Sequence, residues 1–518
     1  MSSINISSWQ PLALVSIVLV AMLVAKVLRS RFRSGLRQLP GPYLAAYSPL
    51  WNITNAASGD SHESFRKLHE KYGQVVRTGP NHVAIADPAM VSVIYGTNNN
   101  FLKSDFYVTF GTPYQKTMMQ SMFSTREKAQ HKSLRQAVSN KYSMTSLRNF
   151  ELQIDSCNAK FIEILREFAT TNEVVDFGTW LQWYAFDVIG AITFSTPFGF
   201  MDEREDIQNI IHGLEGGFWY GSIVGQVPGA HRWLLGNQQL INLFSTVLDT
   251  VNPVPKIVKM VEAAITHYDQ DTLCNATRTD FLSLFRKEAK KSPDRMPHRD
   301  LMNHLMNNLL AGSDTTAISL RAIFYYLVQN PRCLEILRQE IDTAEREKRI
   351  SEHITLAESL QMPYLQACMK EAMRLHPGIG FPLERVVPLE GLAVGNVLLP
   401  AGTIVGMHAW VVHHDKTIFG EDADDFRPER WLAQDVDNIR RMDKCFLSRN
   451  QFGAGTRSCI GKNISMMEMG KLVPQVLRNF DIEWASKDAK WQVKTFWLAK
   501  QTGVHMRFQT RNKGQVNM

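Results

Sequence analysis

The chain has 518 residues, of which 44% are hydrophobic and 21% are charged, and its formal net charge is +7. This composition is typical of a globular protein with one large core or two smaller ones, and it excludes a disordered or fibrous chain. The charge does not indicate nucleic acid, because five basic and no acidic residues lie within positions 1–40 and account for most of the excess.

The cysteines are scattered, and no C-x-x-C pair or C-x-x-C-H sequence occurs. This spacing excludes zinc ribbons and covalently attached haem, and a disulfide framework is not expected. Any functional cysteine is therefore expected to act as a single thiol. The candidates are Cys157, Cys274, Cys333, Cys368, Cys445 and Cys459.

The first element in chain order is an apolar stretch from Trp9 to Leu28, in which Lys26 is the single charge. A helix needs about 20 residues to cross a bilayer, so residues 9–28 are long enough to span one. A cleaved signal peptide is the alternative, but its charges would precede the apolar run, whereas here the arginines follow it. We therefore expect residues 1–35 to be a retained membrane anchor, with residues 36–518 forming a cytosolic catalytic domain.

Beyond "LPGPY" (39–43), helical periods alternate with short β-rich stretches. Residues 300–329 and 363–375 have helical periodicity, and residues 75–87 and 392–407 are rich in β-branched residues and turns. The sequence predicts a mainly α protein with a small β subdomain.

The segment "QFGAGTRSCIGKN" (451–463) combines glycines, an arginine and a cysteine before a predicted helix. Gly453 and Gly455 allow a tight turn, and Gly461 removes a side chain where the helix approaches. The helix amides and dipole favour a thiolate at Cys459, which suits ferric haem as an axial ligand, and Arg457 can bind a haem propionate. A glycine turn with an ordinary buried cysteine is the alternative for any lone thiol.

Phe452, Gly455, Arg457, Cys459 and Gly461 resemble the F-x-x-G-x-R-x-C-x-G signature of the cytochrome P-450 family, and the resemblance extends from about Pro40 to the end of the chain. The stretch from Gly461 to Trp484 is similar to the pisatin-demethylase-like group of fungal enzymes. The resemblance implies the cytochrome P-450 fold, with haem b between a long oxygen-groove helix and the cysteine loop. It also implies a microsomal enzyme of the endoplasmic reticulum membrane, single-pass, with Cys459 as the iron ligand.

"AGSDTT" (311–316) interrupts a helical pattern with poor helix formers, whose hydroxyls can bond to carbonyls one turn earlier and open the helix. It resembles the family's oxygen-binding groove. The resemblance implies that Ala311 and Gly312 lie against the haem, that Thr315 hydrogen-bonds dioxygen, and that Asp314 helps to deliver protons.

The remaining site residues follow from family position. His131, Arg135 and Arg385 are expected to bind haem propionates, and Glu371, Arg374 and Arg430 are expected to form a buried structural network in which "FRPERW" has Trp431 where the family usually has Phe. The candidates for substrate lining are Phe106, Phe110, Phe218, Phe381, Leu383, Trp497 and Leu498.

The resemblance implies a monooxygenase that inserts one oxygen atom of dioxygen into a lipophilic small molecule, in fungal secondary metabolism or detoxification, as a monomeric catalytic unit. No G-x-G-x-x-G or flavin domain is found, so a separate NADPH-cytochrome P-450 reductase is the expected electron donor. A single basic patch for this partner is predicted from Arg126, Lys128, Lys132, Arg440, Arg441, Lys444, Arg449 and Lys462. The alternatives are a reductase-independent haem-thiolate isomerase or dehydratase, and a non-enzymatic haem sensor.

Overall fold

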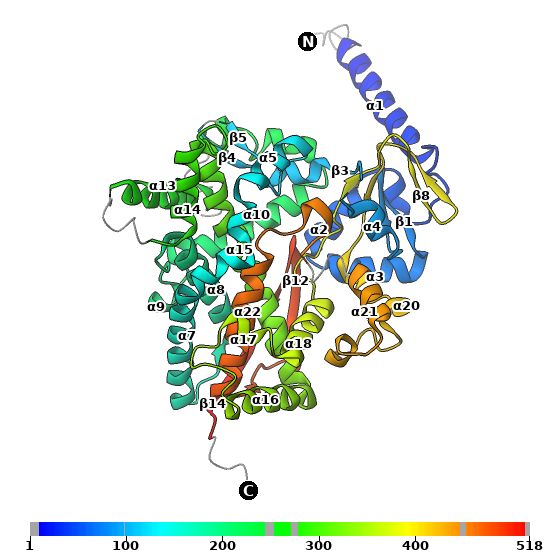
Figure 1. Cartoon of the computed structure of the whole chain (residues 1–518). Coiled ribbons are helices and arrows are strands. Elements are labelled where there is room, and N and C mark those ends of the chain that lie inside the picture. Colours follow the sequence, from blue (N-terminus) through cyan, green and yellow to red (C-terminus); the bar gives the residue numbers. More distant parts are fainter. Residues whose placement is uncertain are drawn as a thin grey trace, which may run out of the picture.

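The computed structural model describes residues 10–97, 99–115, 117–243, 253–270, 278–445 and 452–512. A large helical body lies beside a smaller β-rich part, and α1 extends away from both (Figure 1). The longer helices of the body are α5 (Lys128–Val138), α7 (Glu151–Thr171), α8 (Phe177–Phe194), α10 (Ile210–Val224), α13 (Val254–Gln270), α14 (Phe281–Lys291), α15 (His298–Gln329), α16 (Pro331–Arg346), α18 (Pro363–Leu375) and α22 (Lys462–Asn479).

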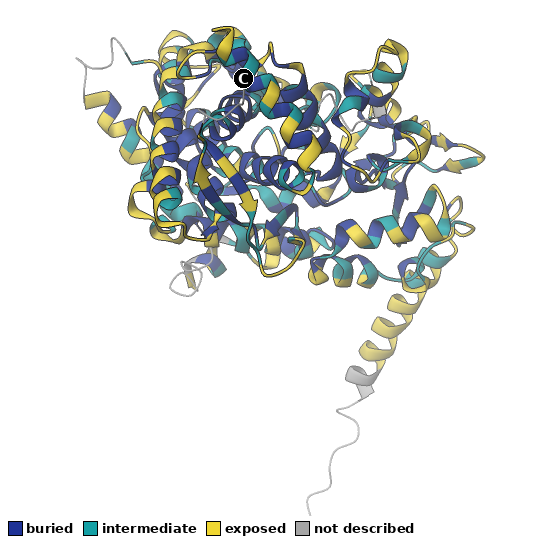
Figure 2. Ribbon diagram, turned by 90° about the horizontal axis from the view of Figure 1, so that it is seen from below, coloured by how far each residue is buried: buried dark blue, intermediate teal, exposed yellow. Residues whose placement is uncertain are grey.

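The core of the body is formed around α15, which runs through its centre and packs against α8, α18 and α22. Nearly every side chain of α8 and most of those of α15 are buried. Helices that are apolar on all sides are stable only inside a protein, and Figure 2 shows the central helices in the colour of buried residues. This confirms the predicted helix near residues 300–329, and α18 has the predicted bounds.

The β-rich part contains a five-stranded sheet in the order β1-β2-β10-β7-β3. Its strands are β1 (Val75–Gly79), β2 (His82–Ile85), β10 (Ile404–Gly406), β7 (Arg385–Val386) and β3 (Leu102–Lys103), and the short helices beside it are α2 (Leu50–Ser58), α3 (Ser61–Tyr72) and α4 (Met90–Tyr95). The hairpin of β8 (Leu392–Val394) and β9 (Val397–Leu399) completes the region. Both predicted β-rich stretches are therefore strands.

Smaller sheets join the helical body at the C-terminal end of the chain. One contains β11 (Phe480–Trp484), β14 (His505–Thr510) and β6 (Val175–Asp176). The other is the hairpin of β12 (Gln492–Phe496) and β13 (Leu498–Thr502), whose register pairs Phe496 with Leu498 across Trp497. The short 3₁₀ helix η9 (Pro428–Trp431) and α21 (Val436–Cys445) precede the cysteine loop along the chain.

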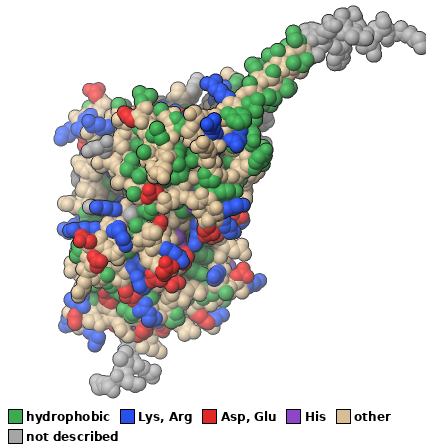
Figure 3. Space-filling model, turned by 90° about the vertical axis from the view of Figure 1, so that its right-hand side faces the viewer, with side chains coloured by type: hydrophobic (Ala, Val, Ile, Leu, Met, Phe, Trp, Pro, Cys, Tyr) green, Lys and Arg blue, Asp and Glu red, His purple; other side chains and the backbone are tan. Residues whose placement is uncertain are grey.

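Helix α1 (Gln10–Arg31) stands away from the body and exposes apolar side chains such as Leu14 and Leu23. Figure 3 shows hydrophobic side chains along α1 and around its base, with Lys and Arg side chains beside the base and further charged side chains of both signs over the rest of this face. Arg77 fixes the base, because its guanidinium donates to the carbonyl oxygens of Ser30 and Arg31. Among the described residues, which exclude Trp9, no helix has the length and apolarity needed to cross a membrane, so the predicted span is not confirmed.

Candidate active site

The cysteine loop is a tight backbone turn whose geometry requires glycine at two positions. Gly453 and Gly455 have φ angles of +74° and +62°, and a Cβ at Gly455 would lie 2.2 Å from the Tyr95 carbonyl oxygen. The Cys459 amide donates to the Phe452 carbonyl over 2.6 Å and closes the turn. Gly461 differs from the prediction, because its φ is −79° and a Cβ there would meet only Cys459 Sγ, at 3.8 Å. Gly461 therefore leaves one side of the sulfur uncovered.

Cys459 lies deep in the molecule, yet its side chain is exposed, so the sulfur faces an internal hollow. Burial raises the pKa of the thiol and outweighs the amides of Gly461 and Lys462 and the charge of Arg135, which act in the opposite direction. The predicted help from the helix start is present but is weaker than desolvation. A stable thiolate at this position therefore needs a cationic partner, as a metal ion provides.

Helix α15 presents Ala311 and Thr315 on one accessible face, although the residues around them are buried. The Thr315 hydroxyl donates to the Ala311 carbonyl over 2.8 Å, and Thr316 donates to Gly312 over 3.0 Å. The predicted opening of the helix is wrong, because α15 is continuous from His298 to Gln329. The hydroxyls share carbonyls of the preceding turn without ending the helix.

Other residues of the "AGSDTT" segment point toward neighbouring helices. A Cβ at Gly312 would lie 2.8 Å from Ile189 Cδ1, so this glycine permits close packing of α15 on α8, and its place against the haem stays a prediction. Asp314 is also buried and accepts a hydrogen bond from the Gln182 side chain of α8, away from the accessible face. Thr316 and Ser465 share a hydrogen bond of 2.9 Å that joins α15 to α22, a contact the sequence did not predict.

Basic side chains from four separate segments form one cluster beside the cysteine loop, and their charges lower one another's pKa values. Burial, followed by Arg457, Arg135 and Lys103, lowers the pKa of His131 to about 4. Burial and Arg385 lower the pKa of Arg457 to about 10. Arg135 also donates to the Ser458 carbonyl over 2.7 Å. The structure therefore brings together all the predicted propionate ligands.

Lys103 is a member of this cluster that the sequence did not indicate. It is buried in β3 and pairs in register with Arg385 of β7, and its ammonium lies 3.9 Å from the centre of the Tyr107 ring. Burial and the charges of Arg385 and Arg457 hold the pKa of Lys103 well below its ordinary value. Like charges directly opposite in a sheet are destabilising, so an anionic group at this point would stabilise the arrangement.

The predicted structural network is fully buried. Both Glu371 oxygens accept hydrogen bonds from Arg374, at 2.8 and 2.9 Å, and Arg430 donates to the same carboxylate over 2.8 Å. Burial alone would raise the pKa of Glu371, but the two guanidinium groups outweigh it and the pKa is lowered. Trp431 donates its indole N–H to Glu371 over 2.8 Å, which a phenylalanine at that position could not do.

All the predicted substrate-lining residues belong to one aromatic cluster that also contains Ile318 of α15, one turn beyond Thr315. The ring centres of Phe106 and Phe110 lie 5.5 and 5.3 Å from that of Trp497. Trp497 has a φ of +63°, which is unusual for a bulky residue and is imposed by the tight turn between β12 and β13. The hairpin thus places the Trp497 ring in the same cluster as Ile318, one turn beyond Thr315 on α15.

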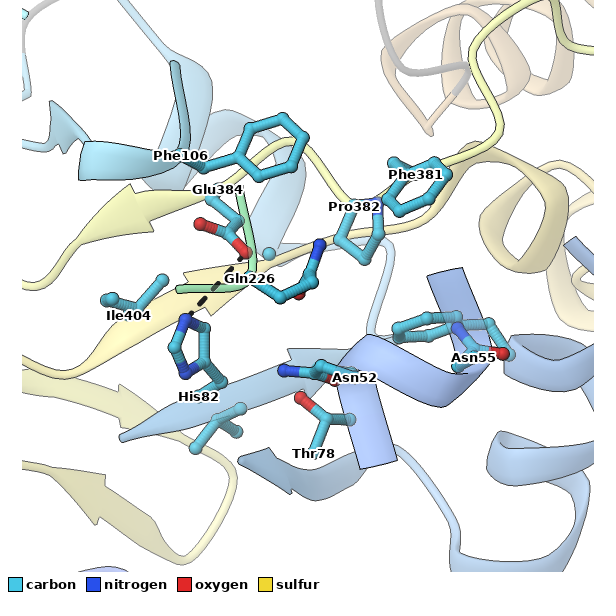
Figure 4. Close-up of a pocket in the computed structure, with 14 residues that line it drawn as sticks. Asn52, Asn55, Thr78, His82, Phe106, Gln226, Phe381, Pro382, Glu384 and Ile404 are labelled. Carbon is cyan, nitrogen blue, oxygen red and sulfur yellow. Dashed lines mark ion pairs between the residues drawn. The ribbon is translucent and has the colours of Figure 1, made fainter. Parts of the chain in front are cut away.

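A small hollow with mixed polar and apolar walls adjoins this cluster (Figure 4). Phe106 and Phe381 lie on one side of it, and Glu384 lies 3.9 Å from His82 within it. Its volume of about 30 Å³ gives room for about one water molecule. Its lining comes from β2, α2 and distant loops, so no local sequence pattern could have indicated it. The remaining polar side chains are Asn52, Asn55, Thr78 and Gln226.

The residues around the Cys459 sulfur fit haem, and they are different from those that line the small hollow of Figure 4. The Cys459 side chain is exposed in the cysteine loop, and the accessible face of α15 carries Ala311 and Thr315. The basic cluster supplies cationic hydrogen-bond donors, which the two haem propionates need. The negative charges of the propionates would in turn relieve the repulsion between Lys103 and Arg385. A soft thiolate donor with several buried cations matches the chemistry of a haem-thiolate site.

Comparisons with known proteins agree with this site. Residues 40–506 match the sequence profile of the cytochrome P-450 family. The chain is 36% identical to a pisatin demethylase of Fusarium vanettenii, over 94% of this chain and 92% of that protein. It is 37% identical to a cytochrome P-450 monooxygenase of Aspergillus terreus, over 92% of this chain and 96% of that protein. A third relative, the cytochrome P-450 monooxygenase cicH of Emericella nidulans, is 36% identical over 95% of this chain.

The family profile covers the catalytic domain, and the relatives align over nearly their whole length. Their names describe monooxygenases and a demethylase, which favours oxygenation over the isomerase and sensor alternatives. The chain therefore belongs to the cytochrome P-450 family, and it is a haem b-dependent monooxygenase that requires dioxygen, a redox partner and an organic substrate.

Proposed function

We propose that the enzyme oxidises a lipophilic, ring-containing small molecule of fungal secondary metabolism or detoxification. The observation that carries this proposal is the aromatic cluster at the end of the accessible face of α15. Flat apolar molecules pack favourably against such rings, which contribute both buried area and directed ring contacts. The name of the pisatin demethylase relative, which the chain resembles over 94% of its length, supports a substrate of this class.

The site residues then have distinct roles. Cys459 would bind the haem iron through its thiolate, and Arg457, Arg135, His131, Arg385 and Lys103 would hold the propionates. Haem with a thiolate ligand supplies the cleavage of the O–O bond. Thr315 places a hydroxyl on the accessible face of α15, where it would donate or accept a proton during turnover, and its bond to the Ala311 carbonyl fixes the direction of its lone pairs. Ile318 and the Trp497 ring orient the substrate over this face.

Electrons come from a separate NADPH-dependent reductase, because an enzyme of this family requires a redox partner and the sequence has no G-x-G-x-x-G motif in a strand-helix context. Each turnover is R–H + O₂ + two electrons + two protons, giving R–OH + H₂O. The experiment is reconstitution of the purified enzyme with reductase, NADPH and ¹⁸O₂, using lipophilic extracts of a strain that lacks the gene. The proposal is supported if a compound that accumulates only in the deletion strain is consumed and its product carries one ¹⁸O atom. Conversion that needs neither NADPH nor reductase would instead establish the isomerase function.

We also propose that α1 attaches the enzyme to the endoplasmic reticulum membrane with the catalytic domain in the cytosol. The support is the row of exposed apolar side chains on α1 and the arginines at its C-terminal end, Arg29 and Arg31. A helix of this kind binds anionic lipid surfaces through apolar and basic contacts. Removal of residues 1–35 should shift the enzyme from the microsomal to the soluble fraction. Retention in microsomes after this truncation would contradict the role of α1.

A further inference from the structure

Asp314 is connected to the molecular surface by a continuous chain of polar side chains. Its carboxylate accepts a hydrogen bond from the Gln182 amide of α8. The Gln182 carbonyl oxygen accepts in turn from Lys500 Nζ of β13 over 3.1 Å. Lys500 then forms an ion pair with Glu215 of α10. Four elements that are distant in sequence therefore meet in one line of contacts that begins next to Thr315.

The orientation of Gln182 is determined by its neighbours. Arg321 donates to the Gln182 carbonyl oxygen over 3.0 Å, and the same guanidinium is held by the Gly178 carbonyl at 2.6 and 2.9 Å. Since both Arg321 and Lys500 can only donate, the oxygen of the amide must face them and the NH₂ group must face Asp314. Lys500 and Arg321 together therefore keep the Gln182 NH₂ group directed at Asp314.

Burial decreases along this line. Asp314, Gln182 and Arg321 are buried, whereas the side chains of Lys500 and Glu215 are 28% and 43% exposed. A buried carboxyl group can exchange protons with solvent only through polar groups or water. Among the described residues, this chain of hydrogen bonds leads from Asp314 to groups that contact water.

The reaction needs such a connection, because two protons are consumed for each substrate oxidised and both end in the product water molecule. Asp314 lies beside Thr315 in α15 but on the buried side of the helix. We infer that Lys500 and Glu215 are positioning residues that act through Gln182 to orient Asp314 and to set its proton exchange with solvent. Only the expected effect on turnover rests on the proposed function.

The charges around Asp314 give the two positioning residues opposite effects. Burial is the largest influence and raises the pKa of Asp314, Lys500 lowers it, Glu215 raises it, and Arg321 and the Gln182 hydrogen bond lower it. Removing the Lys500 charge should therefore raise the pKa of Asp314, and removing the Glu215 charge should lower it. A purely structural role predicts no such opposition.

The test is infrared titration of the carboxyl C=O band in the haem-loaded enzyme, assigned to Asp314 by its loss in Asp314→Asn. In Lys500→Gln the midpoint should move to higher pH by on the order of one pH unit, and in Glu215→Gln it should move to lower pH. Lys500→Arg keeps the charge and should restore the midpoint. Shifts in the same direction, or no shift in either variant, would overturn the inference.

Lys494→Gln is the matched control. Lys494 is the direct cross-strand partner of Lys500 in the β12–β13 hairpin, and it pairs with exposed Asp60 at 3.1 Å. Its loss removes the same charge from the same hairpin and should leave the Asp314 midpoint in place. An equal shift in this control would overturn the inference by showing a general charge effect. Because the titration needs neither substrate nor reductase, it stands even if the proposed substrate class is wrong.

In turnover, the pH at which product formed per NADPH declines should shift in each variant in the same direction as the Asp314 infrared midpoint. With Lys500→Gln the decline at alkaline pH should move upward, because Asp314 keeps its proton to higher pH. With Glu215→Gln it should move downward. Profiles that do not follow the infrared midpoints would exclude Asp314 as the group through which Lys500 and Glu215 act.

Discussion

At the scale of single residues, the site depends on polar groups that are costly to bury. Lys103 and Arg385 face each other across β3 and β7, and within the described residues no carboxylate forms an ion pair with either of them. Lys103 donates instead to the Phe123 carbonyl over 2.5 Å. The repulsion between these two cations lowers the stability of the folded protein, and an anionic cofactor that binds between them would restore it. Haem loading should therefore raise the free energy of unfolding of this enzyme.

Two adjacent hydroxyls in α15 allow a direct test of the oxygen groove. Thr315→Ala should keep haem and substrate binding but should lower product per NADPH by about 10-fold or more, with hydrogen peroxide formed instead, because proton delivery contributes factors of this size. Product, peroxide and NADPH consumption are measured together.

Thr316→Ala is the matched control for that change. Its hydroxyl bonds to Ser465 on the buried side of α15, so its loss should cost about 1 kcal/mol of stability and leave the product yield unchanged. Equal yields of product in Thr315→Ala and the native enzyme would remove Thr315 from the mechanism.

At the scale of elements, Glu371 joins α18 to η9 by accepting hydrogen bonds from Arg430 and Trp431. Arg374 also donates to the His413 and Ala423 carbonyls, at 2.7 and 2.6 Å, so one helix fixes several loop segments. Since the folded pKa of Glu371 lies below its unfolded value, its contribution to stability is present at neutral pH. That contribution is lost as the pH falls through the folded pKa.

Glu371→Gln should lower the free energy of unfolding by roughly 3–5 kcal/mol, because it removes the counter-charge of buried Arg374 and leaves buried Arg430 with only Asp422, 3.4 Å away. Trp431→Phe removes one hydrogen bond to the same carboxylate and should cost about 1–3 kcal/mol. Urea unfolding of the haem-loaded enzyme measures both changes.

The exposed pair of Arg440 and Asp437 in α21 is the control for this network, with side chains 71% and 92% exposed. Asp437→Asn should change stability by less than about 1 kcal/mol. A similar loss in Asp437→Asn and Glu371→Gln would contradict the role of the buried network.

Local patterns in the sequence predicted elements well where one segment carries the whole signal. Residues 363–375 gave α18 with its observed bounds, and the turn at Gly453 and Gly455 followed from residue type alone. The helix opening at "AGSDTT" was wrong because tertiary packing on α8 and α22 keeps α15 continuous despite poor local propensity.

Residues that depend on contacts between distant segments were not predictable. Lys103, Gln182 and Lys500 look like ordinary surface residues in the sequence, and they gain their roles from β7, α15 and α10. Asp314 was identified from its motif, but only the structure shows that it faces α8. The sequence predicts which residues belong to the site more readily than it predicts which way they point.

At the scale of the whole molecule, the predicted basic patch for the reductase is divided. Figure 1 shows α5 and α21 in different parts of the molecule, so Lys128 and Lys132 of α5 do not form one patch with Arg440 and Arg441 of α21. Arg449 lies outside the described residues. Of the two groups, α5 is tied to the cysteine loop, because Arg135 donates to Ser458.

The α5 group is therefore the better candidate for reductase docking. Lys128→Glu combined with Lys132→Glu should slow reductase-driven reduction several-fold at low salt and weaken its salt dependence, because exposed charges act over about 10 Å. Stopped-flow reduction measures the rate, and peroxide-driven turnover should be unchanged. Arg440→Glu with Arg441→Glu is the control, and a larger effect there would place docking at α21.

The central claim is that Cys459 supplies a thiolate ligand to haem in an oxygen-activating enzyme. The most direct measurement is the Soret band of the reduced carbon monoxide complex. The native enzyme and Cys157→Ala, which alters a buried thiol of α7, should both show the long-wavelength band of thiolate-ligated haem. Cys459→Ala should lose that band while keeping the fold by circular dichroism, and persistence of the thiolate band in Cys459→Ala would contradict the account.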